Sequence, residues 1–543
     1  MRITKLLVEN FKSFKERFEV EFTEGLNIVV GDNEAGKSTI LEAINLALTG
    51  FYINRPLRGE LNQYLFNEAS VRNYLDSLKG GAPESPPQIL IELYLTDEEP
   101  MLSGDFNRDR IASSGIHVSI EFNEEYRAEY EALIAAGELK TLPIEYYHVI
   151  WKSFSRELIT ARSIPIKCAY IDSTSARYQN GSDVYIGRIV KDLLSPEEVV
   201  SVSQSHRQMK ETFMGAPAID AINKKITVAS KITDKEIKIS VELSSKNAWE
   251  SGLMTYLNEI PFHFIGKGEQ SIVKTNLALA HEKAKEASVV LIEEPENHLS
   301  HSKLNQLINT IKVSCVKKQV IVTTHSSFVA NKLGLNSLIL LDNKKTLRLN
   351  KLSLGTWSFF EKISGYDTLR LVLCKKAILV EGDSDELVVQ KAYKDIHGVL
   401  PIENCVEVIS VGISFLRFLE IAEKLEKQVS VVTDNDGDVP ALLKKYSEYL
   451  GAKKKPYIDI CYDSVVDVGA LMIGGKSFNY NTLEPKLLKS NGLAKMNLVL
   501  GTAYLDDQGL QVHMRANKTE CALKVFDSKL EIAYPDYILD SIK

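Results

Sequence analysis

Two short segments of this chain carry side chains suited to chemistry on phosphates. Residues 31–38 read Gly-Asp-Asn-Glu-Ala-Gly-Lys-Ser, which combines turn-forming glycines with a lysine and a hydroxyl. Residues 381–385 read Glu-Gly-Asp-Ser-Asp and follow the apolar run 377–380, so carboxylates stand at the end of an expected strand. The first segment predicts a nucleotide cradle, and the second predicts a divalent-metal site able to act on phosphodiesters. Together they suggest that nucleotide binding controls nucleic-acid chemistry.

The first segment has the properties of a P-loop, whose glycines let backbone amides point at phosphate oxygens. Lys37 is expected to reach the β- and γ-phosphates, and Ser38 is expected to bind Mg²⁺. The apolar run 26–30 before it predicts a buried strand, and residues 39–48 have helical periodicity, so a helix N-terminus faces the phosphates. The expected nucleotide contacts are Gly31, Asn33, Gly36, Lys37, Ser38 and Thr39.

A second region agrees with nucleotide hydrolysis. The apolar run 289–292 ends in Glu293 and Glu294. We expect Glu293 to hold the Mg²⁺ shell and Glu294 to polarise the attacking water. A further apolar run, 320–322, leads to His325.

Residues 265–271, Ile-Gly-Lys-Gly-Glu-Gln-Ser, resemble the signature loop of ABC-type and SMC-type ATPases, although the leading Leu-Ser is absent. In those families this loop binds the γ-phosphate held by the opposite subunit, and a histidine after a later strand senses that phosphate. The resemblance therefore implies a sandwich dimer, a sensor role for His325, and nucleotide contacts from Gly266, Gly268 and Gln270. For the Q-loop glutamine, Gln63 and Gln88 are only weak candidates.

Carboxylates follow two apolar runs in the C-terminal part. Glu381 and Asp385 follow one run, and Asp434 and Asp436 follow the run 429–432. Adjacent parallel strands end at the same sheet edge, so these side chains predict an oxygen cage for Mg²⁺ or Mn²⁺. For Asp-Asn-Asp-Gly-Asp alone, a solvated turn or a calcium loop is the alternative. The pairing resembles the TOPRIM domain of topoisomerases, primases and some nucleases.

An ABC-type ATPase followed by a TOPRIM domain resembles the OLD family of ATP-dependent nucleases. The resemblance implies that Glu381, Asp385, Asp434 and Asp436 bind metal, with Glu484 of Thr482-Leu483-Glu484 as a further ligand. It also implies that Lys518 stabilises the transition-state phosphate. An ordinary helix-start carboxylate is the alternative for Glu484, and a solvated lysine is the alternative for Lys518. Two cations ~3.5–4 Å apart suit phosphodiester hydrolysis.

Composition agrees with a soluble globular protein of two to four domains, since 543 residues carry 44% hydrophobic and 25% charged side chains. No apolar run approaches the ~18 residues of a membrane span, and the first residues lack the apolar core of a signal peptide. Six scattered cysteines without C-x-x-C spacing indicate free thiols in a reducing cytosol. We therefore expect a cytoplasmic protein without a membrane partner.

The net charge of −7 does not indicate a nucleic-acid binder, but a carboxylate metal site lowers that sum. Local patches matter more. Lys444-Lys445 and residues 453–455 form either a solvated helix face or a surface that tracks phosphates.

The alternation of strands and helices predicts an α/β protein. We expect an ABC-type P-loop ATPase domain over 1–366 and a TOPRIM-type parallel-sheet nuclease domain over 367–543. Residues of about 178–245 predict a helical or dimerisation insert, with a helix over 195–210 and a strand over 236–243. Residues 335–365 predict a closing strand pair and a linker.

These features favour an ATP- and metal-dependent DNA endonuclease that dimerises through its ATPase domains. The family resemblance implies a role in bacterial or phage defence, with a partner protein or a retron-type nucleic acid. Two alternatives stay open. One is a non-cleaving, SMC-like DNA-binding ATPase, and the other is a topoisomerase-like or primase-like enzyme that uses the same metals. A topoisomerase needs a nucleophilic tyrosine at the cage, and none of the 22 tyrosines lies in a recognisable motif.

Overall fold

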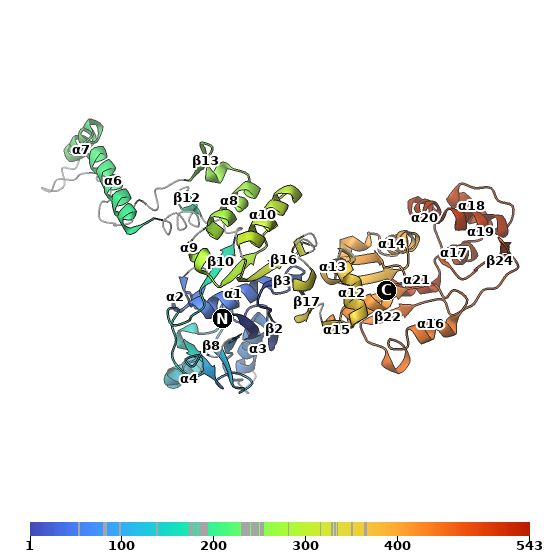
Figure 1. Cartoon of the computed structure of the whole chain (residues 1–543), viewed down its shortest axis with the longest axis horizontal. Coiled ribbons are helices and arrows are strands. Elements are labelled where there is room, and N and C mark those ends of the chain that lie inside the picture. Colours follow the sequence, from blue (N-terminus) through green and yellow to red (C-terminus); the bar gives the residue numbers. More distant parts are fainter. Residues whose placement is uncertain are drawn as a thin grey trace.

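The computed structural model describes residues 1–52, 55–79, 84–96, 99–136, 139–172, 178–179, 182–183, 194–229, 239, 249, 255–280, 282–314, 316–326, 329–330, 333, 335–348, 351–362 and 366–543. The molecule is elongated, with two six-stranded sheets in its N-terminal half and a third, four-stranded sheet in its C-terminal half, besides two-stranded pairs (Figure 1). The predicted α/β fold class is confirmed. Among the described residues, no helix combines the length and apolarity needed to cross a bilayer.

The first sheet of the N-terminal half is antiparallel, with the order β2-β1-β6-β8, and both β7 and β9 pair with β8. Successive side chains of each strand point to opposite faces of this sheet. The strands are β1 (Ile3–Glu9), β2 (Phe18–Glu21), β6 (Ile89–Leu95), β7 (Ser103–Gly104), β8 (Ser113–Phe122) and β9 (Tyr147–Ser153).

The second sheet positions the nucleotide segments. Its order is β10-β15-β16-β3-β17-β18, and all neighbours except β17 and β18 are parallel. Parallel strands end at one edge, so the residues that follow β3, β15 and β16 meet there. The strands are β3 (Leu26–Gly31), β10 (Cys168–Asp172), β15 (Val289–Glu293), β16 (Gln319–Thr324), β17 (Leu338–Asp342) and β18 (Lys345–Arg348).

Helix α1 (Lys37–Thr49) packs against both sheets. Its apolar residues Ile40, Leu41 and Ile44 are fully buried in the core between the sheets. The helix ends at Gly50, whose φ of 69° is in the left-handed region that glycine adopts without strain. The helix predicted over 39–48 is therefore confirmed, and it begins two residues earlier.

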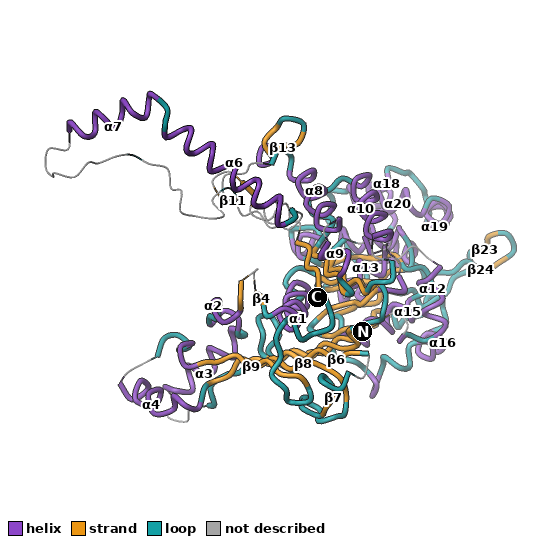
Figure 2. The backbone as a smooth tube through the Cα atoms, turned by 60° about the vertical axis from the view of Figure 1, so that its left-hand side comes forward, coloured by secondary structure: helices purple, strands orange, loops and turns teal. Residues whose placement is uncertain are grey.

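Part of the insert is helical, as predicted. Helix α6 (Pro196–Met214) begins with a capping box, in which the side chains of Ser195 and Glu198 bond each other's backbone N–H. Helix α7 (Pro217–Ala229) follows, and both helices extend away from the sheets in two views (Figures 1 and 2). Apart from Ile239, the strand predicted over 236–243 lies outside the described residues.

The third sheet is parallel, with the order β20-β19-β21-β22. Helix α14 opens directly after β19 and packs on α20. The strands are β19 (Lys376–Val380), β20 (Val406–Ser410), β21 (Gln428–Val432) and β22 (Ile458–Cys461). The helices are α13 (Tyr366–Leu373), α14 (Asp383–His397), α15 (Phe415–Leu425), α16 (Val439–Lys445), α17 (Leu483–Asn491), α18 (Leu493–Leu500), α19 (Asp507–Ala516), α20 (Lys518–Asp527) and α21 (Asp536–Ser541).

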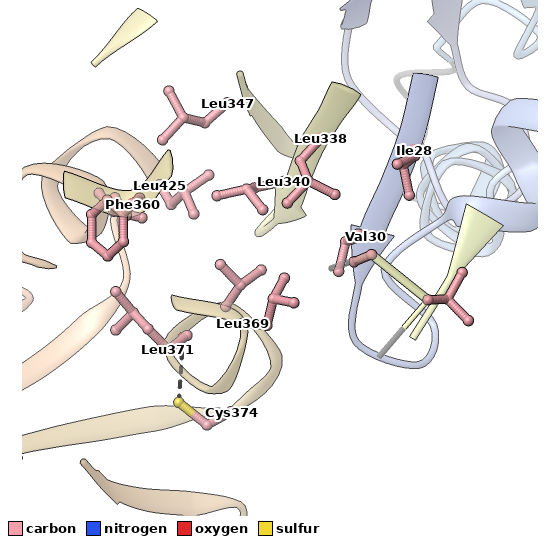
Figure 3. Packing of buried hydrophobic residues seen from close by; sticks show 14 of the residues in the cluster. Ile28, Val30, Leu338, Leu340, Leu347, Phe360, Leu369, Leu371, Cys374 and Leu425 are labelled. Atoms are coloured by element: carbon pink, nitrogen blue, oxygen red, sulfur yellow. Dashed lines mark hydrogen bonds between the residues drawn. The ribbon is translucent and has the colours of Figure 1, made fainter. Parts of the chain in front are cut away.

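The two halves share a buried core. Figure 3 shows side chains from β3, β17, α13 and α15 in one group, including Ile28, Val30, Leu338, Leu340, Leu369 and Leu425. Between the halves lies the predicted strand pair, now β17 and β18, and part of the predicted linker is helix α12 (Leu354–Lys362). The boundary predicted at 366/367 falls at the start of α13, which packs on both β17 and β20. A shared core couples the halves mechanically, because packed interiors transmit displacement.

Candidate functional site

The P-loop joins the end of β3 to the start of α1, and its glycines are required by close contacts. Gly36 has a φ of 112°, and a Cβ there would lie 2.6 Å from Cζ of Phe14. At Gly31, a Cβ would lie 2.5 Å from the carbonyl oxygen of Leu341. Any larger residue at either position would displace the loop.

Lys37 is buried inside this loop. Its Nζ donates to the carbonyl oxygens of Gly31 at 3.0 Å and Asp32 at 2.8 Å, and lies 3.8 Å from Oε1 of Glu294. Burial lowers the pKa of the ammonium, and the charge of Glu294 opposes that effect. A phosphate would offer Lys37 a charged acceptor in place of neutral carbonyls, so the side chain is placed to bind one.

The other predicted P-loop contacts are differently exposed. Ser38 is exposed on the first turn of α1, where a cation or phosphate can reach it. Thr39 is buried, and its Oγ1 lies 3.0 Å from Oγ of Ser13. The side chain of Asn33 is exposed, and its backbone N–H donates to Oδ1 of Asp32 at 2.7 Å. Thr39 therefore has a packing role here, whereas Ser38 faces outward.

The paired glutamates lie beside this loop. Oε2 of Glu293 accepts a hydrogen bond from the hydroxyl of Tyr170 on β10. Oε1 of Glu294 lies 3.5 Å from Nδ1 of His325, and Nδ2 of Asn297 donates to its Oε2 at 3.0 Å. The hydrogen bond to His325 lowers the pKa of Glu294 to about 2, and the same bond raises the pKa of His325. The structure thus brings Lys37, Glu294 and His325 together.

Glu296 belongs to the same site, although no sequence motif predicted a role for it. Its Oε1 accepts from the hydroxyl of Thr324 and from the backbone N–H groups of His325 at 3.0 Å and Ser326 at 3.2 Å. Its Oε2 is buried without a hydrogen-bond partner in the described structure. Glu296 therefore fixes the loop that carries His325. Its place two residues after Glu294 was the available sequence signal.

The signature-like segment opens helix α8 (Lys267–Ala280). A Cβ at Gly268 would lie 2.4 Å from the carbonyl oxygen of His298, whereas a Cβ at Gly266 would meet nothing within 4 Å. Nε2 of the buried Gln270 donates to the carbonyls of Phe262 at 2.9 Å and Ile265 at 2.8 Å. These bonds give Gln270 a structural part in its own subunit, and its nucleotide contact stays a prediction.

The weak Q-loop candidates contact other parts of the chain. Oε1 of Gln63 accepts from the backbone N–H of Leu142 at 3.1 Å, and the carbonyl of Gln88 accepts from Nδ2 of Asn10 at 2.9 Å. These bonds are structural, so they give no support to a Q-loop role for either glutamine.

Four of the predicted metal ligands follow β19 or β21 at one edge of the third sheet. β19 and β21 are parallel neighbours, with Leu379 opposite Val431, so both strands deliver their following residues to the same edge. Oδ2 of Asp385 accepts from the backbone N–H of Gly382 at 3.0 Å, which holds the turn that follows Glu381. Both strands therefore deliver carboxylates to one edge, and the oxygen cage itself stays a prediction.

The other carboxylates after β21 differ in role. Asp436 has a φ of 48° and accepts from Nδ2 of Asn479 at 2.9 Å. Asp438 caps α16, since its Oδ1 accepts from the backbone N–H of Ala441 at 3.0 Å. Asp436 thus stays close to the turn that carries Asp434, whereas Asp438 is used by a helix.

Glu484 and Lys518, far apart in sequence, are also brought together. Nζ of Lys518 lies 3.3 Å from Oε1 of Glu484, and the hydroxyl of Thr482 donates to Oε2 of Glu484 at 3.3 Å. Glu484 is buried at the start of α17, whereas Lys518 is half-exposed at the start of α20. A carboxylate and a cation are therefore placed beside the cage.

Electrostatics links these residues into one cluster. Burial raises the pKa of Asp385 to about 6, with the charges of Glu484 and Glu381 adding to the effect. Burial also raises the pKa of Asp434 well above its ordinary value, with contributions from Asp385, Glu381, Glu484 and Asp436. Carboxylates that are crowded and buried resist ionisation, and a bound dication would stabilise their ionised forms.

The donor set fits hard divalent cations, which prefer carboxylate oxygens. In the conformation described, no three Asp, Glu, His or Cys side chains converge closely enough to enclose an ion; this statement covers the described residues alone. Two tyrosine hydroxyls whose charge surroundings include these carboxylates, those of Tyr446 and Tyr537, are buried without a hydrogen-bond partner in the described part of the chain.

The lysine-rich stretch behaves as a surface of ion pairs. Lys453 pairs with Glu448 at 2.6 Å, Lys454 with Asp459 at 2.8 Å, and Lys455 with Glu423 at 2.8 Å. Paired surface lysines have little spare charge for phosphates, so the solvated-face alternative is favoured.

The chain matches two family models. Residues 5–353 match the family described as AAA domain, and residues 372–436 match the family described as Overcoming lysogenization defect protein-like, TOPRIM domain. The second match includes Glu381, Asp385, Asp434 and Asp436. Glu484 and Lys518 lie beyond it.

Curated relatives are similar over short stretches. The DNA double-strand break repair Rad50 ATPase of Methanopyrus kandleri is 52% identical over 46 residues, which cover 8% of this chain and 5% of that protein. The DNA replication and repair protein RecF of Streptococcus suis is 31% identical over 99 residues, covering 18% and 25% respectively. The chromosome partition protein Smc of Bacillus subtilis is 40% identical over 77 residues, covering 14% and 6%. The chain thus spans no more than a quarter of the length of these three relatives.

Among solved structures, the SMC head domain from Thermotoga maritima aligns with 62% of this chain and 94% of that chain, at 14% identity and a TM-score of 0.29. The SmcHead bound to the C-winged helix domain of ScpA aligns with 61% and 92%, at 16% identity and a TM-score of 0.31. The AAA domain match covers more than half of the sequence, and the TOPRIM match follows it directly. This chain therefore belongs to the AAA domain family, and joins its ATPase domain to a TOPRIM domain in the manner of the OLD family.

Proposed function

We propose that this protein is an ATP-dependent, divalent-metal-dependent DNA endonuclease that nicks its substrate or cuts both strands. The observation that carries the proposal is that carboxylates follow both β19 and β21, parallel neighbours that end at one sheet edge. The same chain carries a P-loop and a paired glutamate at a second sheet edge. Relatives named for DNA repair, replication and chromosome partition support DNA as the substrate class.

In the proposed nuclease site, the residues that would hold Mg²⁺ or Mn²⁺ come from three segments. Bound cations of this kind supply Lewis acidity toward a phosphodiester. The positive charge of Lys518 beside Glu484 is suited to offset the charge that develops on the phosphate during hydrolysis. The proposed ligands are Glu381, Asp385, Asp434, Asp436 and Glu484.

In the proposed ATPase site, Glu294 is the general base. Its pKa of about 2 keeps it ionised at neutral pH, and the hydrogen bond from His325 orients it. Lys37 would bind the phosphates, and the Gly266–Gly268 turn before α8 would contact the γ-phosphate of a second copy. The active form is therefore a homodimer or a higher homo-oligomer assembled through ATPase domains.

The alternatives are a non-cleaving DNA-binding ATPase and a topoisomerase-like enzyme. The relatives of the ATPase half support the first, because each is named for DNA transactions without mention of cleavage. Against the second, Tyr446 and Tyr537, whose charge environments include the cage carboxylates, are 0% and 5% exposed and so poorly accessible to a DNA strand.

A plasmid assay separates the three functions. Supercoiled DNA is incubated with Mg²⁺ or Mn²⁺, with and without ATP, using wild type, Glu381→Ala and Lys37→Ala. Nicked or linear products that require Glu381 support the endonuclease. Relaxed but covalently closed circles would indicate a topoisomerase, and unchanged plasmid with robust ATP hydrolysis would indicate a non-cleaving ATPase.

The proposal extends to a cytoplasmic role in bacterial or phage defence, with a partner protein or a retron-type nucleic acid. It rests on the family alone, so it needs a separate test. Host cells carrying the gene in its native neighbourhood should reduce phage plaque counts, and Glu381→Ala should restore them. Equal plaque counts with and without the gene across a broad phage panel would contradict this part.

A further inference from the structure

Helix α21 places a tyrosine, Tyr537, against the sheet whose strands precede the proposed ligands. α21 packs on β21 and β22, the strands that precede Asp434 and Asp463. Tyr537 is 5% exposed, and its ring lies in the same buried apolar cluster as Val380 and Val432, the last residues of β19 and β21. The ring alone would serve that packing, so a phenylalanine would suffice for the core.

The hydroxyl of Tyr537 is the unexplained part of this side chain. It is buried and has no hydrogen-bond partner in the described structure. Its surroundings are acidic, because the charges of Asp434, Asp385, Asp463 and Glu484 all raise its pKa beyond the effect of burial. A buried donor without a partner is costly, so the hydroxyl of Tyr537 calls for an explanation.

We propose that Tyr537 is a positioning residue, whose hydroxyl donates a hydrogen bond to the carboxylate ligands once they close around a divalent cation. This inference rests on the proposed function, because it requires the cage to bind metal. A hydrogen bond that a neighbouring residue donates to a metal ligand fixes the orientation of that ligand and favours its charged state. Asp463 is not available for closure, since its carboxylate lies 2.6 Å from Nζ of Lys486. Among Asp434, Asp385 and Glu484, the charge of Asp434 acts most strongly on Tyr537, so Asp434 is the expected acceptor.

The test measures Mn²⁺ binding by calorimetry and thermal unfolding without metal. Tyr537→Phe should weaken Mn²⁺ binding about 10- to 100-fold, while the melting temperature of the metal-free protein stays the same or rises. The matched control is Tyr534→Phe, which removes a hydroxyl that donates to Asp395 at 2.6 Å. That control should lower the melting temperature and leave Mn²⁺ affinity unchanged.

Asp434→Asn separates failure of this inference from failure of the proposed function. If Asp434→Asn abolishes Mn²⁺ binding and Tyr537→Phe binds Mn²⁺ like wild type, the role of Tyr537 is wrong and the metal site stands. If wild type and Asp434→Asn bind Mn²⁺ equally, both the cage and the inference fail.

An independent set of contacts links the two halves at the turn between β17 and β18. Nζ of Lys344 donates to the P-loop carbonyls of Glu34 at 3.2 Å and Ala35 at 3.0 Å. The next residue, Lys345, pairs with Glu426 at 2.5 Å, just before β21. One four-residue turn therefore contacts the nucleotide loop on one side and the nuclease sheet on the other.

The same turn holds a buried ion pair. Oδ2 of Asp342 lies 3.2 Å from Nζ of Lys427, whose side chain is 3% exposed and also donates to the carbonyl of Val372 at 3.1 Å. Lys427 directly precedes β21, and Asp434 follows the other end of that strand. A displacement of the turn would reach the cage along a single five-residue strand.

The geometry points to this turn as the route by which nucleotide binding reaches the proposed nuclease site. A phosphate that accepts hydrogen bonds from the P-loop amides would shift the loop carbonyls to which Lys344 donates. The turn that carries Lys344 would move with these carbonyls. The experiment is hydrogen–deuterium exchange over residues 426–434, with and without ATPγS. This measurement does not require DNA cleavage, so the exchange result can be interpreted even if the nuclease assay fails.

Wild type should show a change in exchange over 426–434 on ATPγS binding, and Lys344→Ala combined with Lys345→Ala should lose that change while still binding ATPγS. The control is Lys351→Ala, which removes an ion pair with Glu21 at 2.6 Å inside the ATPase half. This control should respond like wild type. An equal response in the double variant, or no response in nucleotide-bound wild type, would overturn the route.

Discussion

Nζ of Lys518 lies 3.3 Å from Oε1 of Glu484, although 34 positions separate the two residues in the sequence. The pair joins the first turns of α17 and α20. Glu484 is buried and Lys518 is half-exposed. The ammonium group of Lys518 is therefore accessible to a substrate while it stays paired with Glu484.

Lys518→Ala should slow plasmid cleavage about 10²- to 10³-fold, as loss of a single transition-state charge contact does. ATP hydrolysis should be unchanged, because the substitution is remote from the P-loop. Lys524→Ala is the control, since this lysine on the same helix pairs with Glu520 at 3.3 Å and not with the cage. Cleavage by Lys518→Ala at the wild-type rate would assign this residue to the solvated-lysine alternative.

Glu294→Gln should bind ATP and hydrolyse it about 10²-fold or more slowly, because the general base is removed while its shape is kept. The bound ATP should then trap the dimer, which light scattering coupled to size exclusion detects. Glu286→Gln, an exposed residue paired with Lys167, serves as the control. Unchanged turnover in Glu294→Gln would show that another group polarises the water.

Glu296→Ala should destabilise the fold by about 2–3 kcal/mol, because a buried carboxylate acceptor of several hydrogen bonds is lost. It should also slow ATP hydrolysis, since the loop carrying His325 loses its anchor. Urea denaturation and steady-state ATP turnover measure the two effects. Glu296→Gln keeps one acceptor oxygen and should be milder in both. Full activity in Glu296→Ala would leave Glu296 with a purely structural part.

The stability of the metal-free protein should depend on pH through Asp385. Its pKa is raised from 3.8 to about 6 in the folded protein, so the folded state holds a proton that the unfolded chain has released. The free energy of unfolding should therefore fall as the pH rises from about 4 to 6. Urea denaturation should give a shallower slope for Asp385→Asn. Identical slopes in wild type and Asp385→Asn would contradict the raised pKa.

Much of the fold was predictable because hydrophobic patterning fixes strands and helices locally. The apolar run 289–292 became β15 and the run 377–380 became β19, each with one added residue. The ten-residue strand β8 was not predicted, since its Ser-Ser-Gly start gives no strand signal and its pairing with β6 and β9 is long-range.

The functional sites were also predictable only in part, where their residues stand in sequence motifs. Lys37 and Glu294 stand in sequence motifs, so their neighbourhood could be predicted. Tyr537 carries no motif, because only the packing of α21 on β21 and β22 brings it to the carboxylates. The role of Asp438 as a helix cap also depends on where α16 begins, and no spacing rule separates it from Asp436.

The most direct test of the account compares plasmid cleavage by wild type, Asp434→Asn and Asp438→Asn at fixed Mn²⁺ and ATP. The two aspartates lie in one loop, and Asp438→Asn keeps a residue type that caps helices. The account predicts background cleavage by Asp434→Asn and near-wild-type cleavage by Asp438→Asn. Cleavage by Asp434→Asn at the wild-type rate would contradict it.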